Sequence, residues 1–298
     1  MNKLPREKRI QILSMLCEGS SMRSISRVAD VSINTVDKLL CEAGEACVAF
    51  HDEKVRNVTA KRVQCDEIWS FIYSKQKNVA TAKRKDMAYG DVWTWTALDA
   101  DSKLLISWMV GGRDSEYAMA LMDDLRSRLA NRVQLTTDGH RAYLEAVEGA
   151  FGADVDYAML VKIYGEATDP EKRYSPAQCI GAKREPIEGN PDPDHISTSY
   201  VERSNLSMRT FMRRFTRLAL GFSKKFENHC HMVALYTVWY NFVKMHKSLK
   251  MTPAMAAGVS DRLLDMGDIV DLIEARAAKP NRPATYRKRG DAQPEISK

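Results

Sequence analysis

The chain has 298 residues, of which 44% are hydrophobic, and it carries a net charge of +6 with an isoelectric point near 8.9. This length suits one large domain or two, and the hydrophobic content excludes a wholly disordered chain. No apolar run approaches the roughly 18 to 20 residues of a membrane helix. None of the six cysteines forms a CxxC pair, which excludes a zinc ribbon and a redox motif. We therefore expect a cytoplasmic protein with reduced thiols.

The N-terminal residues 1–44 have the pattern of a helix-turn-helix DNA-binding domain. Ser21 and Ser32 are each placed to cap a short helix, and Asp30 stands between the two helices, where the chain must turn. Two short helices joined so tightly are typical of this motif, although a plain helical hairpin would show the same pattern. In the motif, the start of the second helix faces DNA. The residues expected to contact DNA are Ile33, Asn34, Thr35 and Lys38.

A charged helical linker is predicted over residues 45–61, and a sheet domain over 62–250. The runs RVQCDEIWSFIYS, DVWTWTALDA and KLLISWMVGG are rich in Val, Ile, Trp, Tyr and Thr and predict three successive strands. The pattern then predicts helix over 115–129, strand over 133–137, helix over 141–150 and strand over 155–164. This order favours an α/β fold with a mixed sheet flanked by helices.

Residues 165–198 contain five of the ten prolines and predict a long irregular insertion. Loops of this length in a compact domain are usually lids or unstructured segments. Helices are expected from 199 to about 218 and from 227 to 247. The C-terminal part, 251–298, is expected to hold one further helix near 267–278 and a basic tail.

Three acids stand where folding could bring them together. Asp66 lies within the first predicted strand, Asp138 ends the fourth, and Glu202 is near the start of the helix after the insertion. If the first strand is central, the fourth can be its neighbour, and a helix over that edge can add the third acid. Converging carboxylates repel one another unless a cation neutralises them, and Mg²⁺ takes hard oxygen ligands. The pattern suggests cutting and joining of phosphodiesters, although 39 acids make spacing alone a weak indication.

The helix after the insertion carries one acid among many cations. At about 100° per residue, Arg209 and Arg213 each fall within about 20° of Glu202, beside an apolar stripe that runs to Leu218. Glu202 could then reach a metal while the arginines follow a DNA backbone, although a surface glutamate with nearby arginines would look the same. The expected DNA-contacting residues here are Arg203, Arg209, Arg213, Arg217, Lys224 and Lys225.

These residues resemble the DDE transposases. The blocks GGRDSEYA, TTDGHRAY, SYVERSNLSMRTFMRRFTRL and FSKKFENHCHMVALY resemble the insertion-sequence-one family, and the resemblance covers roughly residues 60 to 260. It implies an RNase H-like mixed sheet flanked by helices, preceded by an all-α helix-turn-helix domain. It also implies that Asp66, Asp138 and Glu202 are catalytic ligands of Mg²⁺, with Mn²⁺ as a substitute, and that Arg209 is the basic residue expected after the Glu.

The resemblance further implies a bacterial, nucleoid-associated transposase. Such a protein binds double-stranded DNA, namely the terminal inverted repeats of its element and the target DNA. It is expected to act as a homo-oligomer, most simply a dimer. Members of the family often carry an N-terminal zinc ribbon, for which this chain has no suitable cysteine pairs. Two other functions stay open: a non-catalytic DNA-binding repressor derived from a transposase, and an RNase H-like nuclease without strand transfer.

Two neighbouring candidates are less favoured. Glu67 adjoins Asp66 and should point to the opposite face of the strand, so Asp66 is the preferred ligand unless a bulge reverses the two. His229, Cys230 and His231 are adjacent on a helix and point in different directions, so they are not expected to share a metal.

Overall fold

The computed structural model describes residues 4–83, 86, 88–165, 179–216 and 219–277. Arg217, Leu218 and the basic tail, which are part of the predictions above, lie outside these residues. No helix in the described part of the chain is long and apolar enough to cross a bilayer.

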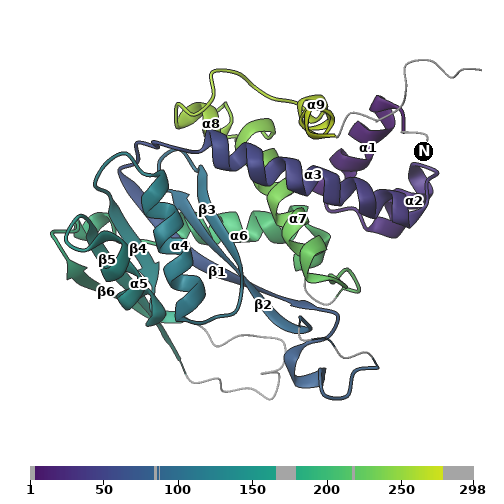
Figure 1. Cartoon of the computed structure of the whole chain (residues 1–298). Helices are drawn as coiled ribbons and strands as arrows, with labels where there is room; N and C mark the ends of the chain where they lie inside the picture. The colour runs from purple at the N-terminus through teal and green to yellow at the C-terminus, as the bar shows by residue number, and fades with distance from the viewer. Residues whose placement is uncertain (1–3, 84–85, 87, 166–178, 217–218, 278–298) are drawn as a thin grey trace, which may run out of the picture.

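A six-stranded mixed sheet forms the centre of the molecule, with the strand order β3-β2-β1-β4-β5-β6 (Figure 1). The central strand β1 pairs antiparallel with β2 and parallel with β4, which confirms that the first and fourth strands are neighbours. The strands are β1 (Arg62–Ile72), β2 (Gly90–Asp99), β3 (Leu105–Gly111), β4 (Gln134–Asp138), β5 (Asp156–Tyr164) and β6 (Cys179–Glu188).

Strand β6 corrects the prediction of an irregular insertion over 165–198 in part of its length, while residues 166–178 of the predicted insertion lie outside the described residues. It pairs antiparallel with β5 at the edge of the sheet and is exposed along most of its length. An edge strand tolerates Pro186, because one side of its backbone needs no partner in the sheet. Without a buried face, the segment CIGAKREPIE has no alternation of hydrophobic residues from which to recognise a strand.

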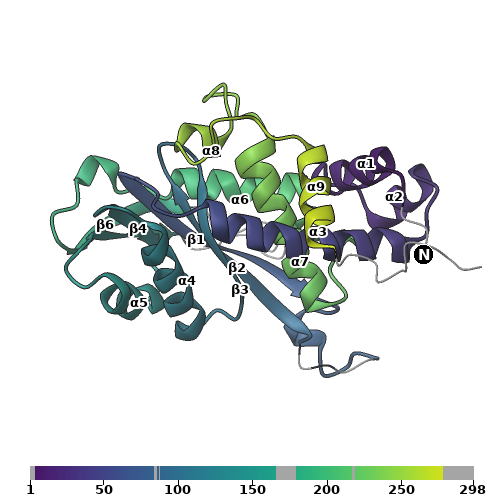
Figure 2. The same cartoon turned by 45° about the horizontal axis from the view of Figure 1, so that its top comes forward.

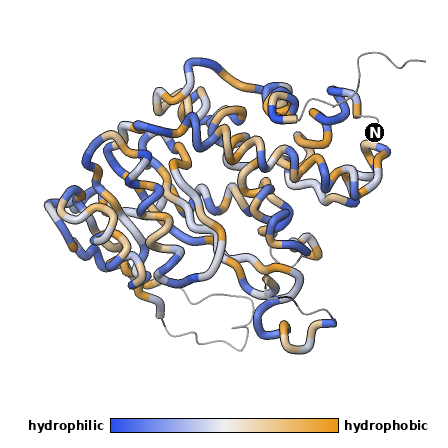
Figure 3. The backbone as a smooth tube through the Cα atoms, viewed as in Figure 1, coloured by the Kyte–Doolittle hydropathy of each residue, from blue (hydrophilic) through white to orange (hydrophobic). Residues whose placement is uncertain are grey.

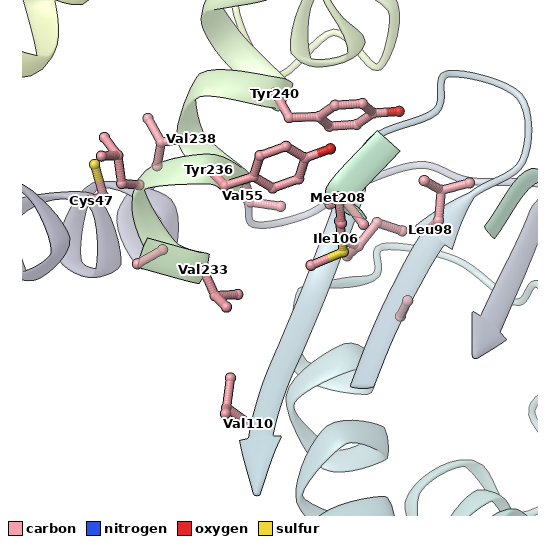
Figure 4. Packing of buried hydrophobic residues seen from close by; sticks show 14 of the residues in the cluster. Cys47, Val55, Leu98, Ile106, Val110, Met208, Val233, Tyr236, Val238 and Tyr240 are labelled. Atoms are coloured by element: carbon pink, nitrogen blue, oxygen red, sulfur yellow. The ribbon is translucent and has the colours of Figure 1, made fainter. Parts of the chain in front are cut away.

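Helices cover both faces of the sheet. The helices α4 (Ser115–Arg128) and α5 (Ala142–Phe151) pack together on one face, and α6 (Ser199–Phe211) packs on β1 and β2 from the other (Figure 2). Figure 4 shows Met208 of α6 beside Ile106 of β3 in the hydrophobic core. The start of α6 is fixed by the buried side chain of Gln64 on β1. Its Oε1 accepts hydrogen bonds from the backbone N of Tyr200 at 2.9 Å and of Val201 at 3.1 Å.

The helix α6 is shorter than predicted. It ends at Phe211, after which Met212 is extended and Arg213–Phe215 form a 3-10 turn. The predicted alignment of Arg213 with Glu202 on one helix face is therefore wrong. The turn after the helix α1 (Arg6–Cys17) closes on this helix end, since an added Cβ on Gly19 would lie 2.8 Å from the carbonyl oxygen of Thr210.

The C-terminal helices also differ from the predicted lengths. The helix α7 (Phe226–Val238) passes into a π turn, Trp239–Val243, where the sequence predicted helix to 247. The helices α8 (Pro253–Ala256) and α9 (Met266–Arg276) follow. The last of these packs against α1 and α3 and confirms the helix expected near 267–278.

The N-terminal helices are α1 (Arg6–Cys17), α2 (Met22–Val28) and α3 (Ile33–Lys54). Both predicted caps are confirmed, since Ser21 Oγ accepts from Ser24 N and Ser32 Oγ accepts from Thr35 N, each at 3.1 Å. Asp30 takes the left-handed turn conformation with φ of 49°. The pair α2–α3 therefore has the local geometry that the caps predict.

The helix α3 continues through the expected linker. It has 22 residues and crosses the predicted boundary between 44 and 45 without a break. Its hydrophobic and hydrophilic residues alternate along the tube in Figure 3. Near its end, His51 Nε2 lies 3.2 Å from the carbonyl oxygen of Leu105 on β3, and Arg128 of α4 pairs with Asp52 at 2.9 Å. One helix thus connects the predicted DNA-contacting turn to the sheet.

Replacing Gln64 by leucine should test how α6 is held. Gln64→Leu leaves two backbone N–H groups of the first helical turn without their acceptor, which we expect to lower the free energy of unfolding by about 2 kcal/mol. Urea denaturation measures this change. Gln134→Leu is the matched control, because Gln134 Oε1 accepts from the exposed backbone N of Asp192, which water can satisfy instead. Equal losses in the two variants would contradict the role assigned to Gln64.

Candidate active site

The parallel pairing of β1 with β4 brings Asp66 and Asp138 together. Cys65 is aligned with Thr137, so the next residue on each strand is one of the two aspartates. Carboxylate oxygens of Asp66, Glu67 and Asp138 all lie within 4.8 Å of one another. Two acids that are 72 positions apart (138 − 66) in the chain therefore meet where β4 ends.

Glu67 belongs to this cluster but reaches it from the opposite face of β1. No bulge separates it from Asp66, since Asp66 aligns with Thr96 and Glu67 with Trp95 on β2. The buried Glu67 carboxylate accepts from Arg113 Nη2 at 3.2 Å. The same guanidinium nitrogen lies 3.8 Å from Asp138 Oδ2. Arg113, which no sequence pattern singled out, thus connects the two carboxylates.

Glu202 faces the cluster from the first turn of α6, but within the described chain it does not join the group of acids that approach within 4.8 Å of one another. Its Oε1 lies 2.7 Å from Nζ of Lys162 on β5. Leu160 aligns with Asp138, so Lys162, two residues further on, lies on the same face of the sheet as Asp138. The ammonium group of Lys162 neutralises Glu202 at the border of the cluster.

Asn205 holds Asp66 from the same helix. Its Nδ2 donates to Asp66 Oδ2 at 2.8 Å, while its buried Oδ1 has no hydrogen-bond partner among the described residues. Asn205 follows Glu202 by three residues, a spacing that puts both on one helix face. The spacing of Glu202 and Asn205 in the segment ERSN could therefore have indicated Asn205 as a site residue. The position of Lys162 in its strand, on the same face as Asp138, could likewise have indicated Lys162.

Crowding raises the pKa values of the clustered acids. Burial, followed by the charge of Asp138, raises the pKa of Asp66 to about 6 and that of Glu67 to about 7. Burial lowers the pKa of Lys162, but the carboxylates of Glu202 and Asp66 outweigh burial and raise it overall. The site therefore concentrates negative charge that the protein neutralises only in part.

The donor set fits a hard divalent cation. The available ligand atoms are carboxylate oxygens of Asp66 and Asp138, with Glu202 and the unpartnered Asn205 Oδ1 nearby. Mg²⁺ prefers such oxygen ligands and uses few protein carboxylates. The chemistry of these donors thus agrees with the predicted Mg²⁺ site, and Mn²⁺ takes similar ligands.

The expected DNA-contacting residues fall in two regions. Ile33, Asn34 and Lys38 are exposed on the first turns of α3, and Thr35 Oγ1 lies 2.8 Å from Ser32 Oγ. The others, apart from Arg217, which lies outside the described residues, are on α6 and on the segment between α6 and α7. Of these, Arg203, Arg213, Lys224 and Lys225 are exposed and Arg209 is half-buried on α6.

His229 has a structural role. It is fully buried, and its ring nitrogens lie 2.8 Å from Ser223 Oγ and 3.3 Å from Ser70 Oγ. Burial lowers its pKa to about 3, so the ring is neutral at physiological pH. It connects α7 to β1, and the only group of potential metal ligands in the described chain is the acidic one.

No family model matches the chain, and no curated protein matches it. Among solved structures, it is similar to a piggyBac transposase in a synaptic complex with hairpin DNA, at 10% identity and a TM-score of 0.34, over 93% of this chain and 73% of that one. A Mos1 transposase paired-end complex with the left transposon end gives 15% identity and a TM-score of 0.21, over 50% and 58% of the two chains. The Mos1 strand transfer complex gives 14% and 0.24, over 81% and 78%. TM-scores this low do not establish a common fold.

Removing the charge of Asp66 should stabilise the metal-free protein at high pH. The folded pKa of about 6 exceeds the unfolded value of about 3.9, so ionisation destabilises the folded state as the pH rises through 6. We expect Asp66→Asn to raise the free energy of unfolding by about 3 kcal/mol at pH 8 in EDTA, with no difference near pH 3. Thermal denaturation across this pH range measures the difference.

Asp101→Asn is the control of opposite sign. A hydrogen bond from Arg62 lowers the pKa of Asp101, so its ionised form stabilises the folded state. That variant should be less stable than wild type at pH 8, and the difference should disappear as the pH falls below the pKa of Asp101. An Asp66→Asn protein that is no more stable than wild type at pH 8 would contradict the account of a crowded acidic site.

Proposed function

We propose that the chain is a transposase that binds the ends of an insertion element and catalyses Mg²⁺-dependent DNA strand cleavage and transfer. The observation that carries this proposal is the meeting of Asp66 and Asp138 at the end of β4, with Glu202 facing them from α6. A basic segment with Arg213, Lys224 and Lys225 follows the same helix. Acidic and basic groups of one continuous segment would then act on one DNA substrate.

Each residue has a distinct task in this proposal. Asp66 and Asp138 would hold the divalent cation, and Glu202 would complete the site after exchanging its contact with Lys162. Bound Mg²⁺ supplies activation of the attacking oxygen and stabilisation of the leaving oxygen. Asn205 would orient Asp66, and Arg113 would restrain Asp138 through its ion pair with Glu67.

The order of the strands supports an RNase H-like assignment of the sheet. Three antiparallel strands are followed by two parallel ones, and the acids lie on the central strand and its parallel neighbour. DNA recognition is assigned to α2 and α3 as a helix-turn-helix, whose caps and tight turn agree with that motif. A dimer is part of the proposal, because two element ends must be held together.

Neutralising Asp138 should abolish catalysis and leave DNA binding intact. In Asp138→Asn the site loses one of its two adjoining carboxylates, and we expect Mg²⁺-dependent cleavage of DNA carrying the element ends to fall by at least about a thousandfold. Gel analysis of cleaved ends, and of 3′-OH ends joined to a second duplex, measures both steps.

Asp154→Asn is the matched control, because Asp154 is an exposed acid paired with Arg126 outside the site. Cleavage that survives in Asp138→Asn would contradict the proposed transposase activity of this site. A wild-type protein that binds the element ends without cutting them would be a repressor. Cleavage without joining would instead identify a nuclease.

A further inference from the structure

The segment between α6 and α7 and the starts of α2 and α3 enclose a groove of about 730 Å³. The recognition side is lined by Met22, Arg23, Ile33 and Asn34. The opposite side is lined by Arg213, Arg214 and the residues from Leu220 to Lys225. Two sets of residues that the sequence assigned separately to DNA contact thus face one concavity. Its volume is in the range of small-ligand sites.

The lining is strongly cationic. It contains Arg23, Arg213, Arg214, Lys224 and Lys225 but only one carboxylate, that of Asp37, which accepts from Asn228 Nδ2. The N-terminal end of the 22-residue helix α3 adds positive potential at the same place. These charges suit phosphate groups.

Arg214 supplies a cation at the wall of the groove. Its Nη1 donates to Ser223 Oγ at 3.0 Å and its Nη2 lies 3.9 Å from Met22 Sδ, and among the described residues it makes no ion pair. Burial lowers its pKa to about 10, so it stays charged at neutral pH. The charge of Asp37 acts on this guanidinium without forming an ion pair with it, so the held guanidinium can still bind an anion.

The same groove is apolar over part of its wall. Leu220 is 96% exposed and Ile33 is 43% exposed, although both line a groove beside cations. Phe222 also lines it, and its ring stacks on Phe71 with centroids 5.2 Å apart. An aromatic ring supported in this way is a rigid surface on which a nucleobase can stack.

We propose that this groove binds a single DNA strand, with the backbone phosphates on the cations and an unstacked base against Leu220 and Phe222. The combination of phosphate-binding and apolar surfaces in one small concavity suits an unpaired strand, whose bases are free to contact the apolar wall, whereas the bases of a duplex are paired and stacked. The inference rests on the proposed function, in which cleavage exposes strand ends near α6. The groove would hold such a strand between the recognition helix and the acidic site.

Binding of a fluorescein-labelled oligothymidine of about 12 nucleotides, followed by anisotropy in EDTA, tests this site. A blunt duplex of equal length, whose recognition the proposed function assigns to α2 and α3, is measured in parallel, and its binding should change less than that of the strand when the groove is altered. Leu220→Asp should weaken strand binding roughly tenfold. Lys224→Gln should lower the slope of log K against log salt by about 0.7, because one phosphate contact is lost.

Matched controls are Leu263→Asp and Lys54→Gln, which change exposed residues outside the groove. Both should bind the oligothymidine as wild type does. Equal effects of the groove and control variants, an equal loss of strand and duplex binding in Leu220→Asp, or displacement of the strand by poly-glutamate as effectively as by unlabelled oligothymidine would each overturn the proposal. Because EDTA removes the metal, strand binding is measured separately from cleavage. The proposal of strand binding in the groove could therefore be contradicted while Asp138-dependent cleavage is confirmed, and cleavage could be absent while strand binding is confirmed.

Discussion

The structure depends on the repulsion between carboxylates that the sheet forces together. The register of β1 against β4 leaves Asp66 beside Asp138, and Glu67 approaches from the other face of β1. Three groups offset this negative charge. Lys162 forms an ion pair with Glu202, and Arg113 lies within ion-pair distance of both Glu67 and Asp138. The side-chain amide of Asn205 donates a hydrogen bond to Asp66. These groups come from β5, from the connection between β3 and α4, and from α6, so three separate parts of the chain meet at the acidic site.

The helix α6 connects this chemistry to the rest of the molecule. Gln64 fixes its first turn, and Glu202 and Asn205 place polar groups over the central strand. Beyond its end, Arg214 contacts Ser223 and Met22, while Ser223 in turn contacts His229. A short chain of contacts thus runs from the sheet to the start of α2, and α3 makes a second connection by running from its exposed first turn to β3.

Much of this arrangement was predictable where one face of an element is buried. The five strands of the core, the helices α4 and α5, and the caps at Ser21 and Ser32 all follow from periodicity and local hydrogen bonding. The strand β6 was not predictable, because an exposed edge strand has no buried face. The end of α6 at Phe211 also escaped prediction, since the apolar stripe continues through Met212 and Phe215, which are buried by the turn rather than by a helix.

For the site, the sequence supplied Asp66 and Asp138, whose position follows from a central first strand. Lys162 and Arg113 escaped because a charged residue on a strand or loop carries no periodic signal, and their roles arise only from contacts across the sheet. Asn205 was not predicted as a site residue, because it is uncharged and the prediction was based on clusters of charged residues. Its spacing of three residues from Glu202 nevertheless places it on the same helix face.

Calorimetric titration with Mn²⁺ tests most directly whether the paired aspartates form a metal site. Wild type and Asp66→Asn would be compared at neutral pH, with Asp101→Asn as a control on an acid whose partner is Arg62. We predict that wild type and the control bind Mn²⁺ with equal affinity, and that Asp66→Asn binds it at least about tenfold more weakly. The same affinity in wild type and Asp66→Asn, or no binding by wild type, would contradict the account.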